Sequence, residues 1–165
     1  MPSFSFEDRP PNPLVLLVED STAEVDLIQR ALGKCGITPR MEIAWDGEDA
    51  LRRLRRTDEH THAETPSLVI LDLNLPRING HEVLRQMKAD PALRPVPVVV
   101  LTVSSADSDV VSAYEGAATS YLTKPADLEE YEQAICTMAD YWLRVVRLPS
   151  EYALPRKHWE RMGND

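Results

Sequence analysis

Leu68-Val69-Ile70-Leu71-Asp72 is the most informative segment for the fold, because it is a short apolar run without a polar interruption and it ends in a carboxylate. Such a run is typical of a strand that helices cover on both faces of a parallel sheet. Residues 14–18 and 96–101 form two further runs of this kind. The weaker runs at residues 41–44 and 119–122 are predicted to lie nearer the sheet edges. The sequence therefore predicts five strands.

Segments with the apolar period of a helix separate these strands. In the first segment, the side chains of Val25, Ile28 and Leu32 recur at helical spacing. Two later segments begin at Asp46 and Asp127, and each aspartate lies three residues before a carboxylate, which is typical of a helix N-terminus. The alternation predicts an α/β protein whose five-stranded parallel sheet is doubly wound by right-handed (βα)5 crossovers.

The composition is that of one soluble domain. The chain has 165 residues, of which 43% are hydrophobic and 27% charged, so a single domain with a real core is expected. The 27 Asp and Glu outnumber the 18 Lys and Arg and give a net charge of −9, which argues against a nucleic-acid partner. No apolar run approaches the roughly 18 residues that span a bilayer, and residues 1–13 lack the pattern of a signal peptide. We therefore expect a cytoplasmic protein without a membrane partner.

The two cysteines show no pattern of a disulfide framework or a zinc site. Cys35 and Cys136 lie far apart in the chain and outside any Cys-x-x-Cys motif. The sequence therefore predicts two reduced thiols.

Polar side chains follow the predicted strands at the edge of the sheet where ligands of such folds bind. These residues are Glu19, Asp20, Asp72, Thr102, Tyr121, Thr123 and Lys124. Three carboxylates in one crevice repel one another unless a cation lies among them, and hard oxygen ligands favour Mg²⁺. Lys124 can neutralise a phosphoryl group and the Thr102 hydroxyl can donate to one of its oxygens. The set indicates phosphoryl transfer to a carboxylate.

Four pieces of sequence carry these residues in the order Val18-Glu19-Asp20, Asp72 to Gly80, Leu101-Thr102 and Tyr121-Leu122-Thr123-Lys124-Pro125. Together they resemble the receiver domain of two-component response regulators over about residues 13–145. The resemblance implies a flavodoxin-like receiver at residues 13–147 with an extended C-terminal helix. A disordered or extended arm at residues 1–12 would precede it, and a tail at residues 148–165 would follow it.

The resemblance also assigns the chemistry. It implies that Asp72 accepts a phosphoryl group from a histidine kinase, so that the chain is a phosphoacceptor signalling module and not an enzyme in the ordinary sense. Mg²⁺ would be held by Asp20, by Asp72 and by the carbonyl of Asn74. Glu19 would help to hold the ion through a water molecule.

The response to phosphorylation is implied in the same way. Thr102 and Tyr121 match a switch pair in which the hydroxyl moves toward the phosphoryl group and the aromatic side chain turns inward. Lys124 matches the phosphate partner, and the peptide bond to Pro125 is expected to be cis. The output would be a changed protein-binding or dimer surface, without a DNA-binding output domain.

Apolar residues of the last helix continue at helical spacing to about Arg147. They predict an exposed surface that suits a homodimer, made of Tyr131, Trp142, Val145 and Val146. The alternative is that residues 148–165 fold back over this surface. Residues 141–149 resemble the extended tail of small response regulators that are paired with bacterial phytochrome kinases, which makes a bacteriophytochrome a candidate for the cognate histidine kinase.

Two other functions are compatible with parts of the pattern. A phosphatase of the haloacid dehalogenase type also uses an aspartyl nucleophile, Mg²⁺ and a lysine, but it needs an aspartate two residues after the nucleophile, where this chain has Asn74. A flavin-binding module needs a loop rich in Gly, Ser and Thr after the first strand. The acidic pair Glu19-Asp20 at that place would repel a phosphate in the absence of a metal ion.

Overall fold

The structure, a computed structural model, describes residues 12–149, so most of the predicted arm and tail lie outside the described residues. The strands are β1 (Leu14–Val18), β2 (Arg40–Ala44), β3 (Leu68–Leu71), β4 (Val98–Thr102) and β5 (Ser120–Thr123). The helices are α1 (Thr22–Lys34), α2 (Gly47–Arg55), α3 (Gly80–Ala89), α4 (Asp107–Glu115) and α5 (Leu128–Asp140), with a 3₁₀ turn η2 (Asp58–His60) and a π-helical turn η3 (Tyr141–Val145). All neighbouring strands are parallel, in the order β2-β1-β3-β4-β5. The predicted doubly wound sheet is confirmed, with the two weak strands at its edges.

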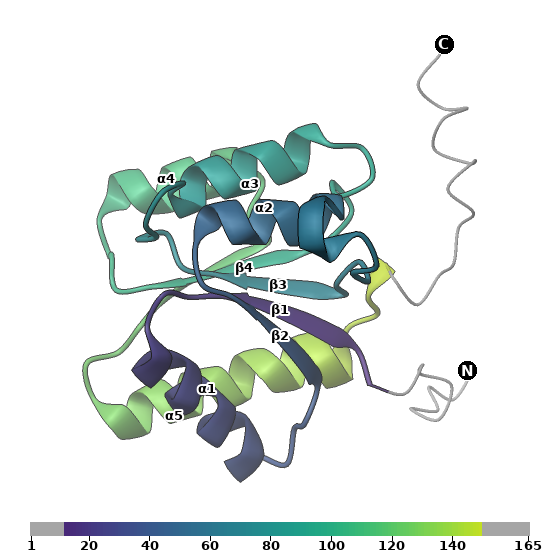
Figure 1. Ribbon diagram of the computed structural model, residues 1–165. Helices are drawn as coiled ribbons and strands as arrows, with labels where there is room; N and C mark the ends of the chain where they lie inside the picture. The colour runs from purple at the N-terminus through teal and green to yellow at the C-terminus, as the bar shows by residue number, and fades with distance from the viewer. Residues whose placement is uncertain (1–11, 150–165) are drawn as a thin grey trace, which may run out of the picture.

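Helices cover both faces of the sheet, as Figure 1 shows, with α1 and α5 on one side and α2, α3 and α4 on the other. Alternate residues of β1 enter the two cores, because successive side chains of a strand point to opposite faces. Val15 and Leu17 pack in the core under α1 and α5, whereas Leu16 and Val18 pack in the core under α2 and α3. This double burial explains why the central strands are continuous apolar runs.

The helix starts are fixed by side-chain caps at the sheet edge that carries the polar residues. Asp46 accepts a hydrogen bond from the backbone N–H of Asp49 at 2.7 Å, and Asp127 accepts one from Glu130 at 2.9 Å. Both predicted start signals are therefore confirmed. At the other end of the chain, α5 continues through η3 to Val145, close to the predicted end of the last helix.

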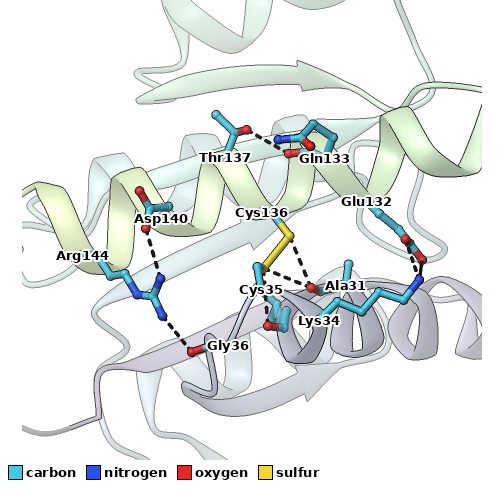
Figure 2. Close-up of a disulfide and its surroundings, with 11 residues drawn as sticks. Ala31, Lys34, Cys35, Gly36, Glu132, Gln133, Cys136, Thr137, Asp140 and Arg144 are labelled. Carbon is cyan, nitrogen blue, oxygen red and sulfur yellow. Dashed lines mark hydrogen bonds and ion pairs between the residues drawn. A yellow bond between two sulfur atoms is a disulfide. The ribbon is translucent and has the colours of Figure 1, made fainter.

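A disulfide between Cys35 and Cys136 joins the end of α1 to the middle of α5 (Figure 2). The predicted pair of reduced thiols is therefore wrong. Sequence spacing could not show that the two helices lie side by side, with the Cα atoms of the cysteines 5.9 Å apart. Polar contacts flank the bond on both sides, from Lys34 to Glu132 at 2.6 Å and from Arg144 to the carbonyl of Gly36 at 2.8 Å.

Reduction of this disulfide is expected to lower the free energy of unfolding by about 2–4 kcal/mol, because the bond closes a long loop in the unfolded chain. Urea unfolding of the oxidised protein, with and without a thiol reductant, measures the difference. The Cys136→Ser variant is the control, and its midpoint should not respond to the reductant. Equal midpoints for the oxidised and the reduced wild-type protein would contradict the expectation.

Among residues 12–149, no helix has the length and apolar character needed to cross a membrane.

Candidate functional site

Three carboxylates meet where β1 and β3 end. Oxygen atoms of Glu19, Asp20 and Asp72 all lie within 4.8 Å of one another. The register explains the meeting, because Val18 is paired with Leu71 and the residues that follow these two continue side by side. Glu19 and Asp72 are only 2% and 7% exposed, while Asp20 faces solvent. The structure thus brings together three of the residues that the sequence assigned to a metal site.

Lys124 supplies the positive charge inside this cluster. Its ammonium nitrogen lies 2.9 Å from Glu19 Oε2 and 3.0 Å from Asp72 Oδ2. The backbone N–H of Lys124 donates to the carbonyl of Thr102 at 2.7 Å, which prolongs the pairing of β4 with β5 and points the lysine at the end of β3. The buried carboxylates therefore share one buried cation.

Asn74 and Thr102 complete the surroundings of Asp72. The backbone N–H of Asn74 donates to Asp72 Oδ1 at 3.0 Å, and the Asn74 side-chain amide donates to Thr102 Oγ1 at 3.3 Å. The loop returns close to Asp72 at Gly80, where a Cβ atom would overlap the carbonyl oxygen of Asp72. The Thr102 hydroxyl is buried and accepts one hydrogen bond, so its own proton is available to an oxygen placed beside Asp72.

Tyr121 connects the site to the loop between β4 and α4. Its half-buried ring packs on the core under α2 and α3, and its hydroxyl donates to the carbonyl of Ser104 at 2.8 Å. Burial raises the pKa of Tyr121, which keeps its hydroxyl a donor. Ser104 in turn donates to Asp109 in α4. Neither Ser104 nor Asp109 was assigned to the site from the sequence, because only the folded loop carries the carbonyl of Ser104 to Tyr121.

Two expectations from the sequence are wrong. The Lys124–Pro125 peptide bond is not cis, since the described residues contain no cis peptide bond. Tyr131 is not on an exposed surface, because it is 4% exposed and its hydroxyl donates to Glu24 of α1. The apolar stripe of the last helix begins under α1 and becomes exposed only further along the chain, which sequence periodicity alone does not reveal.

Burial raises the pKa of Glu19 to about 7, although Lys124 opposes this rise. A carboxylate with this pKa is largely protonated below pH 7, and a proton on it competes with a cation. The three clustered carboxylates offer hard oxygen donors, which suit a divalent ion that prefers oxygen, such as Mg²⁺. These donors therefore fit the predicted metal. The fit requires the ionised form of the carboxylates.

Mg²⁺ affinity is therefore expected to increase as the pH rises from 6 to 8, by up to about tenfold per pH unit below pH 7, because binding releases the Glu19 proton. Isothermal titration calorimetry at several pH values measures this dependence. In the Glu19→Gln variant the affinity should be lower and nearly independent of pH over this range. An equal affinity of the wild-type protein at pH 6 and pH 8 would show that Glu19 does not control binding.

Comparison with known proteins gives a matching family model and two relatives that align over most of their length. The family model of the response regulator receiver domain matches residues 15–136. The chain is 43% identical to the Probable methanogenesis regulatory protein FilR2 of Methanothrix harundinacea, over 82% of this chain and 87% of that protein. It is 39% identical to the response regulator Rcp1 of Synechocystis, over 88% of this chain and 99% of that protein.

Solved structures agree with these matches. The Mn²⁺-bound form of Rcp1 superimposes with a TM-score of 0.80 at 39% identity and covers 83% of this chain and 99% of that chain. The phosphorylated cyanobacterial phytochrome response regulator RcpA also gives a TM-score of 0.80, at 37% identity, over 84% of this chain and 99% of that chain.

Proposed function

Since this chain belongs to the response regulator receiver domain family, we propose that Asp72 is the residue that accepts a phosphoryl group from a histidine kinase. As a receiver-domain signalling protein, the chain has a histidine kinase as its partner. The choice of Asp72 rests on one observation. Its carboxylate lies within the carboxylate cluster and, at the same time, 3.0 Å from the Lys124 ammonium group. A buried carboxylate that has both a cation and further oxygen donors beside it suits a nucleophile for phosphoryl transfer.

Receiver domains bind a divalent metal ion, and we propose that Mg²⁺ is the ion here, held by Asp20, Asp72 and the Asn74 carbonyl, with Glu19 beside them. The bound ion would supply positive charge to the carboxylates and to the incoming phosphoryl group. The support is the donor set itself, which consists of oxygen atoms. Mn²⁺ is the ion in the Rcp1 structure, and it prefers the same class of ligand.

The side chains of the site have separate roles in the proposed reaction. An Asp72 carboxylate oxygen attacks the phosphorus of a phosphohistidine, so that an O–P bond forms while the N–P bond breaks and the imidazole leaves. Lys124 offsets the negative charge of the transferred group, and the Thr102 hydroxyl donates to one of its oxygens. To make this hydrogen bond, the Thr102 hydroxyl would move toward the phosphoryl group. The movement would bias the positions of Tyr121 and of the loop at Ser104, which shifts the population of surface conformations.

Stoichiometric labelling distinguishes this proposal from the phosphatase alternative, to which the reported matches give no support. Incubation with acetyl phosphate and Mg²⁺, read by intact mass and peptide mapping, should add one phosphoryl group at Asp72. Many turnovers of a chromogenic phosphomonoester, with no phosphoryl group accumulating on Asp72, would support the phosphatase instead.

The cognate kinase is proposed to be of the phytochrome type, with the chain located in the cytoplasm. The support is the similarity to RcpA, which is a phytochrome response regulator, together with the tail resemblance of residues 141–149. Cytoplasmic thiols are kept reduced. In that compartment the Cys35–Cys136 bond would therefore form only under oxidising conditions.

The continuation of α5 is proposed as the contact surface of a homodimer, formed by Trp142, Val145 and Val146 without Tyr131. Val145 is 58% exposed and Tyr141 beside it is 51% exposed. A hollow of about 1030 Å³ lies between β5 and α5, and both Tyr141 and Trp142 line it. An apolar surface with an adjacent hollow suits a second copy of the chain.

A dimer in solution at micromolar concentration is therefore expected. Light scattering with and without beryllofluoride and Mg²⁺ measures the mass, and Val145→Asp should shift it toward the monomer. Val111→Asp is the matched control, because Val111 is an equally apolar residue of α4 that is 54% exposed. A wild-type protein that stays monomeric under both conditions would reject the proposed dimer.

A further inference from the structure

Lys124 has a third carboxylate partner that the proposed phosphoryl transfer does not use. Glu24 Oε2, from the first turn of α1, lies 3.5 Å from the Lys124 ammonium nitrogen. The same oxygen accepts a hydrogen bond from the hydroxyl of Tyr131 at 2.9 Å. Tyr131 belongs to α5, so the two contacts connect the acceptor site to both helices on one face of the sheet.

Helix capping does not explain the Glu24 side chain. Ser21 and Glu24 have the spacing of a capping box, in which the glutamate accepts a hydrogen bond from the backbone N–H of the capping serine. Only half of that motif forms, because the Ser21 hydroxyl accepts from the Glu24 N–H at 3.3 Å, while the Ser21 N–H donates to Glu19 Oε1 at 3.1 Å. The Glu24 carboxylate instead faces Lys124 and Tyr131.

Packing does not explain the Tyr131 hydroxyl either. The ring is buried in the core under α1 and α5, where a phenylalanine would fill almost the same space. A buried hydroxyl needs a hydrogen-bond partner, and here the partner is the carboxylate of Glu24. Burial and this carboxylate raise the pKa of Tyr131, so the hydroxyl remains protonated and remains a donor.

We infer that Tyr131 and Glu24 are positioning residues for phosphoryl transfer at Asp72, an inference that rests on the proposed function. The Tyr131 hydroxyl fixes the Glu24 carboxylate, and Glu24 holds the Lys124 ammonium group from the side of α1. Lys124 can then give up its hydrogen bond to Asp72 and donate to a phosphoryl oxygen while Glu19 and Glu24 keep its nitrogen in place. An ammonium group that is held before the reaction has less freedom to lose during it.

Tyr131→Phe tests this role, because the change removes one hydroxyl and alters no charge. With acetyl phosphate and saturating Mg²⁺, the maximal rate of phosphorylation should fall about fivefold, as expected for the loss of one hydrogen bond that acts through a charged group. The acetyl phosphate concentration at half-maximal rate and the Mg²⁺ concentration at half-saturation should stay unchanged, because neither group contacts the donor or the metal. A merely structural role would change the Mg²⁺ dependence as well.

A double-mutant cycle with Glu24→Gln adds the second test. In the Glu24→Gln background, Tyr131→Phe should have no further effect on the maximal rate, because the hydroxyl acts only through the Glu24 carboxylate. Lys34→Gln is the control, since it removes an ion pair with Glu132 between the same two helices outside the site and should leave the rates unchanged.

The outcomes distinguish failure of the positioning role from failure of the proposed function. Suppose first that Asp72 of the wild-type protein is labelled. The positioning role is then wrong if Tyr131→Phe keeps the wild-type rate, if the effect of Tyr131→Phe adds to that of Glu24→Gln, or if Lys34→Gln lowers the rate equally. In each of these cases the proposed function stands. If wild-type Asp72 is not labelled at all, the proposed function itself fails, and the positioning role fails with it.

Discussion

The Asp72→Asn variant is expected to lose phosphorylation completely. The asparagine amide has nearly the same shape as the carboxylate and can still accept the hydrogen bond from Asn74, but it is a far weaker nucleophile. The fold should persist, because Lys124 retains its contact with Glu19 at 2.9 Å. Incubation with acetyl phosphate and Mg²⁺, followed by intact mass measurement, reads the result directly.

Asp140→Asn is the matched control for this prediction. The same chemical change is made there on an aspartate of α5 whose side chain is 54% exposed and pairs with Arg144. This variant should be labelled at the wild-type rate. Labelling of Asp72→Asn to the wild-type extent would place the phosphoryl group on another residue and contradict the proposed role of Asp72.

The Lys124→Met variant is expected to be destabilised by about 3–5 kcal/mol at pH 8 without metal, because a buried ion pair loses its cation. Glu19 and Asp72 would then face each other in the interior without a positive partner. Phosphorylation should also slow by about 100-fold or more, since the group that offsets the charge of the transferred phosphoryl is gone. Urea unfolding and the rate of labelling measure the two effects.

The pH dependence of this destabilisation has a defined direction. The pKa of Glu19 is raised to about 7 even with Lys124 present, and loss of the lysine raises it further. In the variant the carboxyl is therefore protonated as the pH falls toward 7, and the repulsion disappears. The loss of stability should therefore be largest above pH 7 and shrink toward pH 5, and Mg²⁺ should restore part of it at pH 8.

Lys34→Met is the control for Lys124→Met. Lys34 is also paired with a carboxylate, but its side chain is 63% exposed and its pair with Glu132 lies at the surface, so its loss should cost less than about 1 kcal/mol. If Lys124→Met is as stable as the wild-type protein at pH 8 without metal, the buried carboxylates do not depend on the lysine.

The fold and the meeting of the acidic residues could be predicted because both follow from short-range patterns. The apolar runs that became β1 and β3 mark central strands, and neighbouring parallel strands bring Glu19 and Asp72 to one edge of the sheet. What the sequence did not reveal depends on packing between distant helices. The bond of Cys35 to Cys136 and the burial of Tyr131 both depend on how closely α1 lies against α5.

The Glu24 side chain shows a different limit of sequence reading. Its spacing from Ser21 indicates a local motif, and the local motif forms in part. The carboxylate is free for Lys124 only because Glu19 has taken the N–H of Ser21, which is a competition between two acceptors. Such a choice depends on the three-dimensional position of both carboxylates, which no spacing rule contains.

A crystal structure of the protein with Mg²⁺ and beryllofluoride would show whether Asp72 is the phosphoacceptor, because beryllofluoride forms an analogue of an acyl phosphate on the acceptor carboxylate. We expect beryllium on an oxygen of Asp72, with Lys124 and Thr102 contacting its fluorine atoms and Mg²⁺ among the acidic side chains. An adduct on any other residue, or no adduct with Mg²⁺ bound elsewhere, would contradict this expectation.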